Sequence, residues 1–337
     1  MTMRKRKPET RNPRPESRPL RLGTRASSLA LTQSRYVANL LEKARPGLRV
    51  ELVEITTTGD VVRGKPLRSF GGAGVFVKEL ESALLAGRVD LAVHSLKDLP
   101  TRQPNGLVIG AISGREDTRD VAIIRGSRRL QDLPPGSVIG SGSLRRRGQL
   151  KAKYPHLEFA EIRGNVETRI RKVAEGQYAG TILARAGLKR LGLLGVARAS
   201  RARGSRAGCP CHAQVLSHAV MLPAPGQGAL AVECRAHDVR VRRLLKALHN
   251  PLVAACVTAE RAALEALGGG CHLPFGALGT VSGQTLRLRG VLCMPDGSAI
   301  VRAEASAPVA KARNLGRNAA REILAQGGRN VLEQLHV

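Results

Sequence analysis

Residues 89–100 have the sequence VDLAVHSLKDLP, in which a short apolar segment passes into a polar turn. The apolar residues of 89–93 predict a buried strand. A helix is expected immediately before it, over 75–85, with Gly87 suited to its C-terminal cap. A strand that directly follows a helix and ends in polar side chains is typical of an α/β layer fold with a partly parallel sheet.

The same alternation of strands and helices extends along the first two thirds of the chain. Before residue 75 we expect a strand at 20–22, a helix that Ser27 or Ser28 can cap, and a strand at 50–57. The pattern restarts near Asp120, with strands at 121–124, 137–140, 157–162 and 181–184 and helices from Leu144 and over 166–174. A further strand, at 228–234, is expected to return to the first domain. The sequence therefore predicts two α/β domains.

The character of the chain changes from Pro251 onwards. A helix over 258–267 leads into three glycines and Cys271, and alternating apolar residues follow at 286–292. The last stretch, 309–335, is predicted to be helical with a break at Gly327-Gly328. We therefore expect a small α+β domain after the two α/β domains. The expected boundaries are a disordered basic tail at 1–18, domain 1 at 19–115 plus 228–248, domain 2 at 116–227 with a basic insertion at about 197–220, and domain 3 at 249–337.

The composition limits the possible partners. The chain of 337 residues has a net charge of +29, which should attract anions. Nucleic acid, acidic lipid and a polycarboxylate substrate all fit, and Arg-rich codon usage is the alternative explanation. Aromatic residues make up only 2% and Trp is absent, which weighs against base-stacking platforms.

The sequence gives no indication of a membrane or an oxidising compartment. No apolar run approaches the ~20 residues that cross a bilayer. The basic stretch at 1–19 lacks the apolar centre of a secretory signal, so we expect a cytoplasmic protein. The 6 cysteines are scattered along the chain, which favours reduced thiols over a disulfide framework.

Arginines recur where strands are predicted to end. They are Arg25, Arg145, Arg146, Arg163 and Arg169. Ligands bind beyond the carboxyl ends of strands in open α/β sheets, and Arg makes bidentate contacts with carboxylates. These positions predict a cleft for an acidic ligand, with a solvated basic face as the alternative.

Three further positions could carry chemistry, and local sequence leaves each open. Asp98 ends a strand, where a carboxylate can transfer protons or stabilise a cation, or simply cap a turn. Cys271 follows glycines that allow an exposed turn, so it could be a nucleophile or attachment point, or a buried structural thiol. The group Cys209, Cys211, His212 and His218 does not have a standard zinc spacing, and we predict no metal.

Seven segments in a fixed order resemble the hydroxymethylbilane synthase (porphobilinogen deaminase) family. They are GTRASSLA at 23–30, HSLKDLP at 94–100, GSGSLRR at 140–146, RGNV at 163–166, GLKRL at 187–191, PGQG at 225–228 and GGC at 269–271. A single motif would be weak evidence, but seven in register over almost the whole chain make a chance match very unlikely.

The resemblance implies a fold, a reaction and a cofactor. Domains 1 and 2 would be α/β lobes like those of type II periplasmic binding proteins, and domain 3 would carry the cofactor cysteine. That cysteine is Cys271 by position, joined by a thioether to a dipyrromethane primer. Four porphobilinogen molecules would be added head to tail, each losing ammonia, and hydroxymethylbilane would then be released. Such a protein is a monomeric, cytoplasmic transferase of tetrapyrrole and haem biosynthesis.

The resemblance also implies roles for individual residues. Asp98 would be the catalytic residue, stabilising the cation left by loss of ammonia and, secondarily, shuttling protons. The residues that match cofactor- and substrate-binding positions are Arg25, Ser27, Phe76, Ser95, Lys97, Ser141, Ser143, Arg145, Arg146, Arg163, Arg169 and Arg190. Residues 60–74 match a flexible loop over the cleft. Three positions depart from the common pattern: Ala73 in place of Lys, Gly142 in place of a hydroxyl residue, and His272 in place of Gln.

Three rival interpretations are open. A binding module with similar lobes would bind a small anion reversibly and would not need Asp98 and Cys271 together. A nucleic-acid-binding protein is suggested by charge alone, without a recognition helix or RNA-binding motif. An inactive relative of the enzyme would keep the motifs but not the turnover. The expected partner is therefore porphobilinogen, with no specific nucleic acid and no membrane.

Overall fold

The computed structural model describes residues 18–56, 77–126, 128–194, 211–270 and 272–335. Residues 1–17 of the expected basic tail, the loop at 60–74, Phe76 and Cys271 lie outside the described residues. What the sequence predicts for them therefore stays a prediction. Arg18, in contrast, is described and donates to Asp90 at 3.1 Å, so the expected disorder does not extend to it.

The first domain is built on a five-stranded sheet with the order β2-β1-β3-β10-β4. Its strands are β1 (Leu20–Thr24), β2 (Val50–Glu54), β3 (Leu91–Ser95), β4 (Leu107–Arg115) and β10 (Ala229–Arg235). β1 pairs in parallel with β2 and β3, whereas β10 runs antiparallel between β3 and β4. The predicted return of the chain near residue 229 is therefore confirmed, and β4 is a strand that the sequence pattern did not predict.

The second sheet repeats this arrangement with the order β7-β6-β8-β5-β9. Its strands are β5 (Asp120–Arg125), β6 (Val138–Gly140), β7 (Glu158–Ala160), β8 (Gly180–Ala184) and β9 (Cys211–Val215). β6 is parallel to β7 and β8, and β5 is antiparallel to both of its neighbours. The two sheets therefore have equivalent strand orders, which confirms the predicted pair of α/β domains.

The expected surface insertion at 197–220 needs a correction in its described part. Cys211–Val215 forms the edge strand β9, which pairs with β5 from Val121 to Arg125. Leu216 is only 2% exposed, and Cys211 and Ala213 pack against buried Val121 and Ile123. Because these apolar side chains complete the sheet, this segment is part of domain 2 rather than a loop on it.

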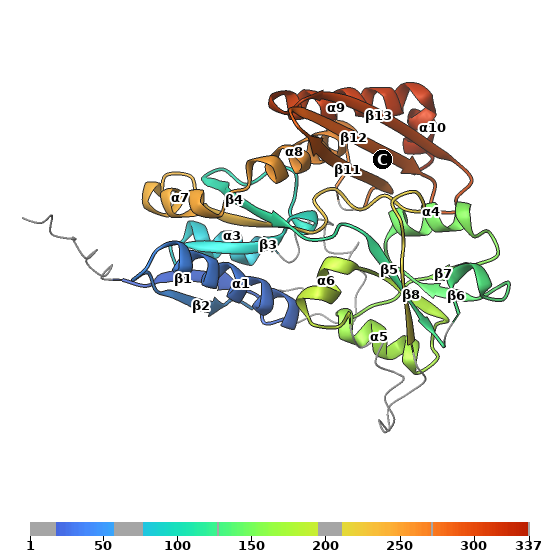
Figure 1. Ribbon diagram of the computed structural model, residues 1–337, viewed down its shortest axis with the longest axis horizontal. Helices are drawn as coiled ribbons and strands as arrows, with labels where there is room; N and C mark the ends of the chain where they lie inside the picture. The colour runs from blue at the N-terminus through green and yellow to red at the C-terminus, as the bar shows by residue number, and fades with distance from the viewer. Residues whose placement is uncertain (1–17, 57–76, 127, 195–210, 271, 336–337) are drawn as a thin grey trace, which may run out of the picture.

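Helices flank both sheets (Figure 1). They are α1 (Ser28–Ala44), α3 (Lys78–Leu85), α4 (Leu144–Lys153), α5 (Val166–Ala174), α6 (Arg185–Arg190) and α7 (Val239–Leu245). Short helical turns are η2 (Leu96–Asp98), η3 (Leu130–Asp132), η5 (Lys246–Leu248) and η6 (Val309–Lys311). Local sequence explains their starts: Ser27 caps α1 by accepting from the Ala30 amide, and Asn165 caps α5 by accepting from the Thr168 amide.

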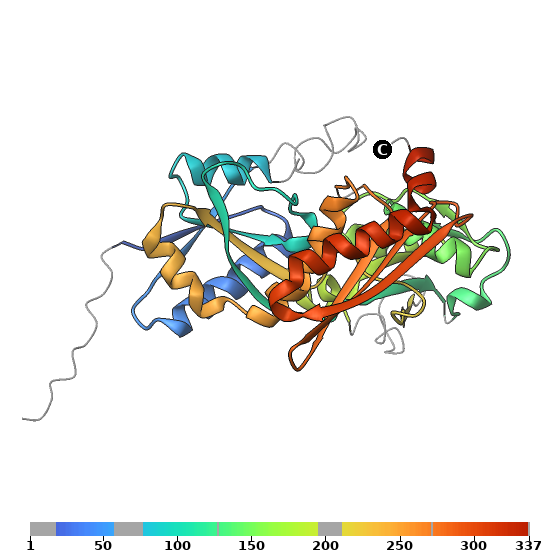
Figure 2. The same ribbon diagram turned by 90° about the horizontal axis from the view of Figure 1, so that it is seen from above.

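The third domain packs helices on one face of an antiparallel sheet (Figure 2). Its elements are α8 (Pro251–Ala266), β11 (Phe275–Ser282), β12 (Thr285–Cys293), β13 (Ile300–Pro308), α9 (Ala312–Ile323), η7 (Leu324–Gly328) and α10 (Arg329–Gln334). α8 begins seven residues earlier than predicted because Asn250 caps it and Pro251 fits its first turn. The predicted break near Gly327 is confirmed, since its φ is 102°.

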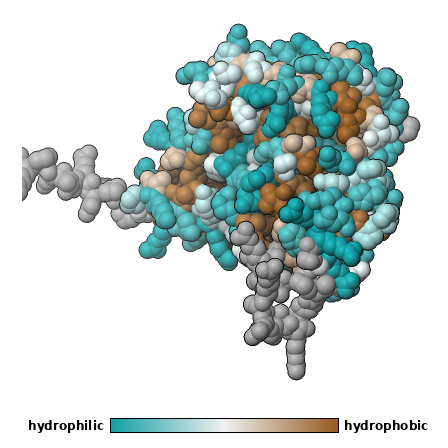
Figure 3. All heavy atoms as spheres, turned by 45° about the vertical axis from the view of Figure 1, so that its right-hand side comes forward, coloured by the Kyte–Doolittle hydropathy of each residue, from teal (hydrophilic) through white to brown (hydrophobic). Residues whose placement is uncertain are grey.

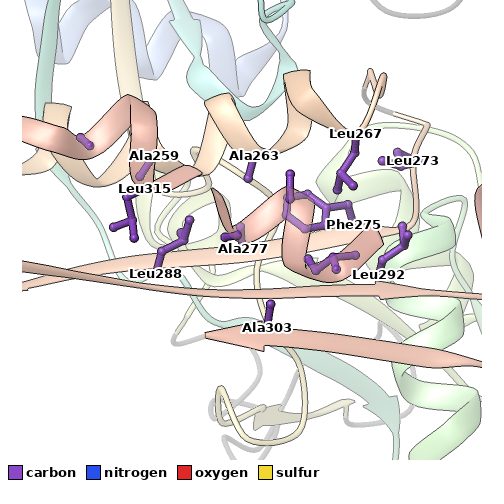
Figure 4. Packing of buried hydrophobic residues seen from close by; sticks show 14 of the residues in the cluster. Ala259, Ala263, Leu267, Leu273, Phe275, Ala277, Leu288, Leu292, Ala303 and Leu315 are labelled. Carbon is purple, nitrogen blue, oxygen red and sulfur yellow. The ribbon is translucent and has the colours of Figure 1, made fainter. Parts of the chain in front are cut away.

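Small residues let α8 and α9 lie very close in the core of this domain. Figure 4 shows Ala259 and Ala263 of α8 and Leu315 of α9 gathered with Phe275, Leu288 and Leu292 from the sheet. A Cβ atom added to Gly316 would stand 2.2 Å from the Ala259 carbonyl oxygen. The helix contact therefore requires glycine at this position.

We predict that Gly316→Ala destabilises the protein although alanine favours helices. The gain of about 1 kcal/mol in helix propensity is outweighed by overpacking against a backbone atom, which typically costs about 1–3 kcal/mol. We therefore expect a net decrease in the free energy of unfolding, measured by urea denaturation. Asn314→Ala on the exposed face of the same helix is the control, and it should be neutral or slightly stabilising. Equal behaviour of the two variants would contradict the close packing.

Candidate active site

Asp98 lies on a well-anchored turn at the carboxyl end of β3. The backbone of Leu96–Asp98 forms η2, closed by the Leu99 amide donating to the Leu96 carbonyl at 3.2 Å. Leu96 and Leu99 are 0% and 2% exposed. Just before the turn, the Gln33 amide donates to Ser95 Oγ at 2.9 Å. Because its neighbours are buried, the turn presents the exposed Asp98 carboxylate from a rigid base.

Cations of the second domain face this turn of the first. Arg169 on α5 interacts electrostatically with both Asp98 and Arg146. Burial, and then the charge of Arg146, lower the pKa of Arg169 to about 10, so it stays charged at neutral pH. Burial also lowers the pKa of Lys97, which interacts with Asp98 and with the arginines of α4. The strand ends of the two domains therefore meet at one electropositive site.

The first turn of α4 carries two buried arginines around one carboxylate. Ser143 caps the helix, and Ser141 Oγ accepts from the Ser143 amide at 3.3 Å. Arg145 donates to Asp120 at 3.0 Å and Arg146 donates to it at 2.7 Å.

Asp120 itself is 1% exposed, and Gln227 also donates to it at 3.1 Å. Burial alone would raise the pKa of Asp120, but Arg146 and Arg145 lower it below its ordinary value. The carboxylate is therefore held in its charged form.

The two arginines differ in what they leave for a ligand. The Nη atoms of Arg145 donate to Asp120 and to the Leu222 carbonyl, the latter at 2.7 Å. Arg146 spends its Nη atoms on Asp120 and on the Ile182 carbonyl, but its buried Nε has no hydrogen-bond partner among the described atoms. A buried donor without a partner is costly, so Arg146 Nε suits an acceptor supplied by a ligand.

Of the other binding residues predicted from the sequence, two follow strands and one ends a helix. Arg25 follows β1 and is half-buried, next to the cap residue Ser27. Arg163 follows β7 and pairs with Glu161 at 2.5 Å. Arg190 ends α6 and donates to the Gly228 carbonyl at 2.7 Å, which ties the second domain to the returning strand β10. α6 and α1 are also in contact, as Figure 1 shows.

Two buried acids were missed by sequence reasoning. The local sequence at Asp120 indicates only the start of a strand, and that at Glu260 indicates only a helix. Glu260 on α8 is 0% exposed and accepts from Arg115 at 2.8 and 2.9 Å. It also accepts from the amides of Gly226 and Gly279, each at 2.7 Å. The single residue thus joins the end of β4, the chain returning from domain 2, and β11.

The described residues limit the chemistry further. Within them, no group of three or more His, Cys, Asp or Glu side chains could hold a metal ion. No described helix has the length and apolar character needed to cross a membrane. The surface in Figure 3 is mostly hydrophilic, with apolar areas between. The cations that interact with Asp98 make this site suitable for an anionic ligand.

Comparison with known proteins identifies close relatives. A family model described as porphobilinogen deaminase, dipyromethane cofactor binding domain, matches residues 20–243, and the model of the C-terminal domain of porphobilinogen deaminase matches 254–325. A porphobilinogen deaminase of Syntrophobacter fumaroxidans is 44% identical over 95% of this chain and 98% of its own length. That of Pelobacter propionicus is 45% identical with the same coverage.

Solved structures give a more distant likeness. The BvgS VFT2 domain of Bordetella pertussis has a TM-score of 0.39 and 16% identity, covering 68% of this chain and 86% of that one. The methionine binding protein MetQ has a TM-score of 0.40 and 14% identity, covering 68% of this chain and 89% of that one. The evidence for two α/β domains is therefore the equivalent strand orders of the two sheets.

We predict that Asp120→Asn strongly destabilises the protein. The change leaves two buried arginines without a counter-charge, and breaking a buried ion pair from one side typically costs about 3–5 kcal/mol. Urea unfolding measures the loss, and Asp132→Asn at an exposed position is the control, with an expected change within about 0.5 kcal/mol.

The pH dependence of the same pair gives a second test. Because the folded protein lowers the pKa of Asp120, its stabilisation is present above the ordinary aspartate pKa of about 3.9 and is lost as the pH falls. The difference in unfolding free energy between wild type and Asp120→Asn should therefore stay constant from neutral pH to about pH 5. It should narrow only at more acidic pH. Narrowing near pH 7 would contradict the charged assignment.

Proposed function

The chain belongs to the porphobilinogen deaminase family, and we propose how its own residues perform the reaction of that family. The protein is a hydroxymethylbilane synthase, a transferase of tetrapyrrole biosynthesis. It condenses porphobilinogen units head to tail on a dipyrromethane cofactor with loss of ammonia, and it then releases hydroxymethylbilane.

The described cations fit a dipyrromethane that carries acetate and propionate groups. Arg169 and Lys97 are both partly buried and both interact with Asp98 and Arg146, and an anionic ligand would offset the cost of burying these cations. Arg146 Nε is a buried donor in need of an acceptor. When bound, the cofactor supplies the terminal pyrrole on which the new unit is placed. We assign its thioether attachment to Cys271, which follows α8 in the sequence.

We assign the catalytic role to Asp98. As porphobilinogen loses ammonia, positive charge develops on the pyrrole unit, and an exposed carboxylate on a fixed turn can stabilise it. The same carboxylate can accept the proton released when the new carbon–carbon bond forms. The observation that carries this assignment is the position of Asp98 opposite Arg169, where substrate carboxylates and the reacting cation can be held together.

The remaining residues are assigned either to ligand binding or to positioning. We propose that Arg25, Arg163, Arg169, Arg190 and Lys97 bind the carboxylates of cofactor and growing chain, because Arg169 and Lys97 interact with Asp98 and the other three match binding positions of the family. Ser27, Ser95, Ser141 and Ser143 shape the turns that carry them, and Phe76 is assigned to the pyrrole rings by family position. Arg145 is a positioning residue, because its Nη atoms are engaged within the protein. Arg146 has a positioning role through its Nη atoms and can also bind a ligand through its Nε.

We further propose a monomer of three domains in the cytoplasm, with no specific nucleic-acid partner. The domains are 19–115 plus 228–248, 116–227, and 249–337. Separate sheets for each of these parts support the division. The family membership weighs against a simple binding module and against nucleic acid as the main ligand.

The attachment site can be tested by intact-protein mass spectrometry. We expect added mass equal to one dipyrromethane on the purified chain, lost in Cys271→Ser. Cys211→Ser, at the one cysteine among the described residues that is not buried, should keep the added mass. Retention of the adduct in Cys271→Ser would place the thioether elsewhere.

The role of Asp98 is tested by Asp98→Asn. The variant keeps the size of the side chain but loses its charge, and we expect turnover to fall by about 100-fold or more. Its free energy of unfolding, measured in urea, should stay within about 1 kcal/mol of the wild-type value, because the side chain is exposed. Asp132→Asn should retain full turnover. Near-normal turnover of Asp98→Asn would refute the assignment.

A further inference from the structure

One side chain of the third domain donates several hydrogen bonds to the turn that carries Asp98. Arg261 lies on α8, and its Nη1 donates to the Leu99 carbonyl at 2.9 Å and to the Leu96 carbonyl at 3.4 Å. Its Nη2 donates to the Pro100 carbonyl at 2.5 Å. Three carbonyl groups of one short turn are therefore collected by a single guanidinium group.

Apolar packing reinforces these hydrogen bonds. Val257, one helical turn before Arg261 on α8, is 0% exposed and belongs to the same buried cluster as Leu96 and Leu99. Gly226, in the chain that returns from domain 2, lies so close that a Cβ atom added to it would stand 2.9 Å from the Leu96 side chain. The turn is thus held between α8 and the chain that returns from domain 2.

The chemistry of the contact requires arginine. Carbonyl groups at the end of a helical turn point their negative ends outwards, and a cation there is favourable. The guanidinium group is a planar fork that reaches several acceptors at once, whereas the ammonium group of lysine is a compact point charge on a flexible stem. A lysine at position 261 would keep the charge but would hold the turn less firmly.

The same helix leads to the proposed attachment point. α8 ends at Ala266, and Cys271 is the fifth residue after it in the sequence. Arg261 therefore connects, in one side chain, the turn with Asp98 in domain 1 and the helix before Cys271 in domain 3.

We propose that Arg261 is a positioning residue for the condensation. It fixes the Asp98 turn relative to the helix that leads to the tethered primer, so that the carboxylate keeps its place at the reacting end. This inference rests on the proposed roles of Asp98 and Cys271. A displacement of about 1 Å at such a site can lower the rate by about 100-fold, so the loss of this clamp should be visible in turnover.

The structure provides a matched control for the variant. Arg102 and Glu265 join the same two segments of chain, with Nε donating to Oε1 at 3.0 Å. The Arg102 side chain is 84% exposed, and surface pairs of this kind contribute little. Arg102→Gln thus removes a tie between the same segments without touching the carbonyl groups of the turn.

The experiment compares Arg261→Gln, Arg261→Lys and Arg102→Gln with the wild-type holoenzyme. Primer content is measured by intact mass, and kcat and KM are measured with porphobilinogen. Hydrogen–deuterium exchange follows the Leu99 amide, which donates to the Leu96 carbonyl. Val331→Ala, in the core of domain 3 and away from the turn, provides a variant of lowered Tm for comparison.

For Arg261→Gln we expect kcat to fall by about tenfold or more per mole of loaded enzyme, with KM within about threefold of wild type. Exchange at Leu99 should accelerate, Arg261→Lys should recover part of both properties, and Arg102→Gln should change neither. Val331→Ala should lower Tm with normal kcat and normal exchange at Leu99.

Two outcomes would overturn the inference. One is wild-type exchange at Leu99 and wild-type kcat in Arg261→Gln. The other is an equal loss of kcat in Val331→Ala at the same Tm, which would mean that Arg261 only adds stability. If the wild type lacks primer and turnover, the proposed function fails instead, and the exchange at Leu99 still decides whether Arg261 holds the turn.

Discussion

The buried carboxylate of Glu260 is the interaction on which the arrangement of the three domains depends. It lies on α8, and its hydrogen bonds reach Arg115 at the end of β4, Gly226 in the chain returning from domain 2, and Gly279 in β11. A buried charge is tolerated only when it is fully paired, and here both oxygens are engaged. The strand ends that form the site are held in place by a contact outside that site.

Two aspartates illustrate how environment divides structural from chemical roles. Asp120 is buried between Arg145 and Arg146, so its charge is used up within the protein. Asp98 is exposed on a turn whose neighbours are buried, and cations face it across the domain boundary. The same functional group thus stabilises the second domain in one place and is available to substrate in the other.

Local sequence predicted what local physics controls. The strand before His94, the Ser27 cap and the break near Gly327 follow from short-range patterns. The strand β9 was missed because an Arg- and Gly-rich stretch precedes it, and the partners of Asp120, Glu260 and Arg261 were missed because they are distant in the chain. A charged residue on a predicted helix is normally taken as exposed, and only its tertiary contacts reveal burial. The roles of Asp98 and Cys271 came from the family resemblance, since local sequence left both open.

The return of β10 to the first sheet has a consequence for folding during synthesis. β10 lies between β3 and β4 but is made after the whole of the second sheet. Until residue 235 has left the ribosome, β4 and the edge of β3 that lies away from β1 have no partner in their own sheet. Unpaired strand edges favour wrong association, and such long-range pairings form slowly. The first lobe to be synthesised is therefore completed only after the second, which makes the nascent chain most dependent on chaperones while the second lobe is being made.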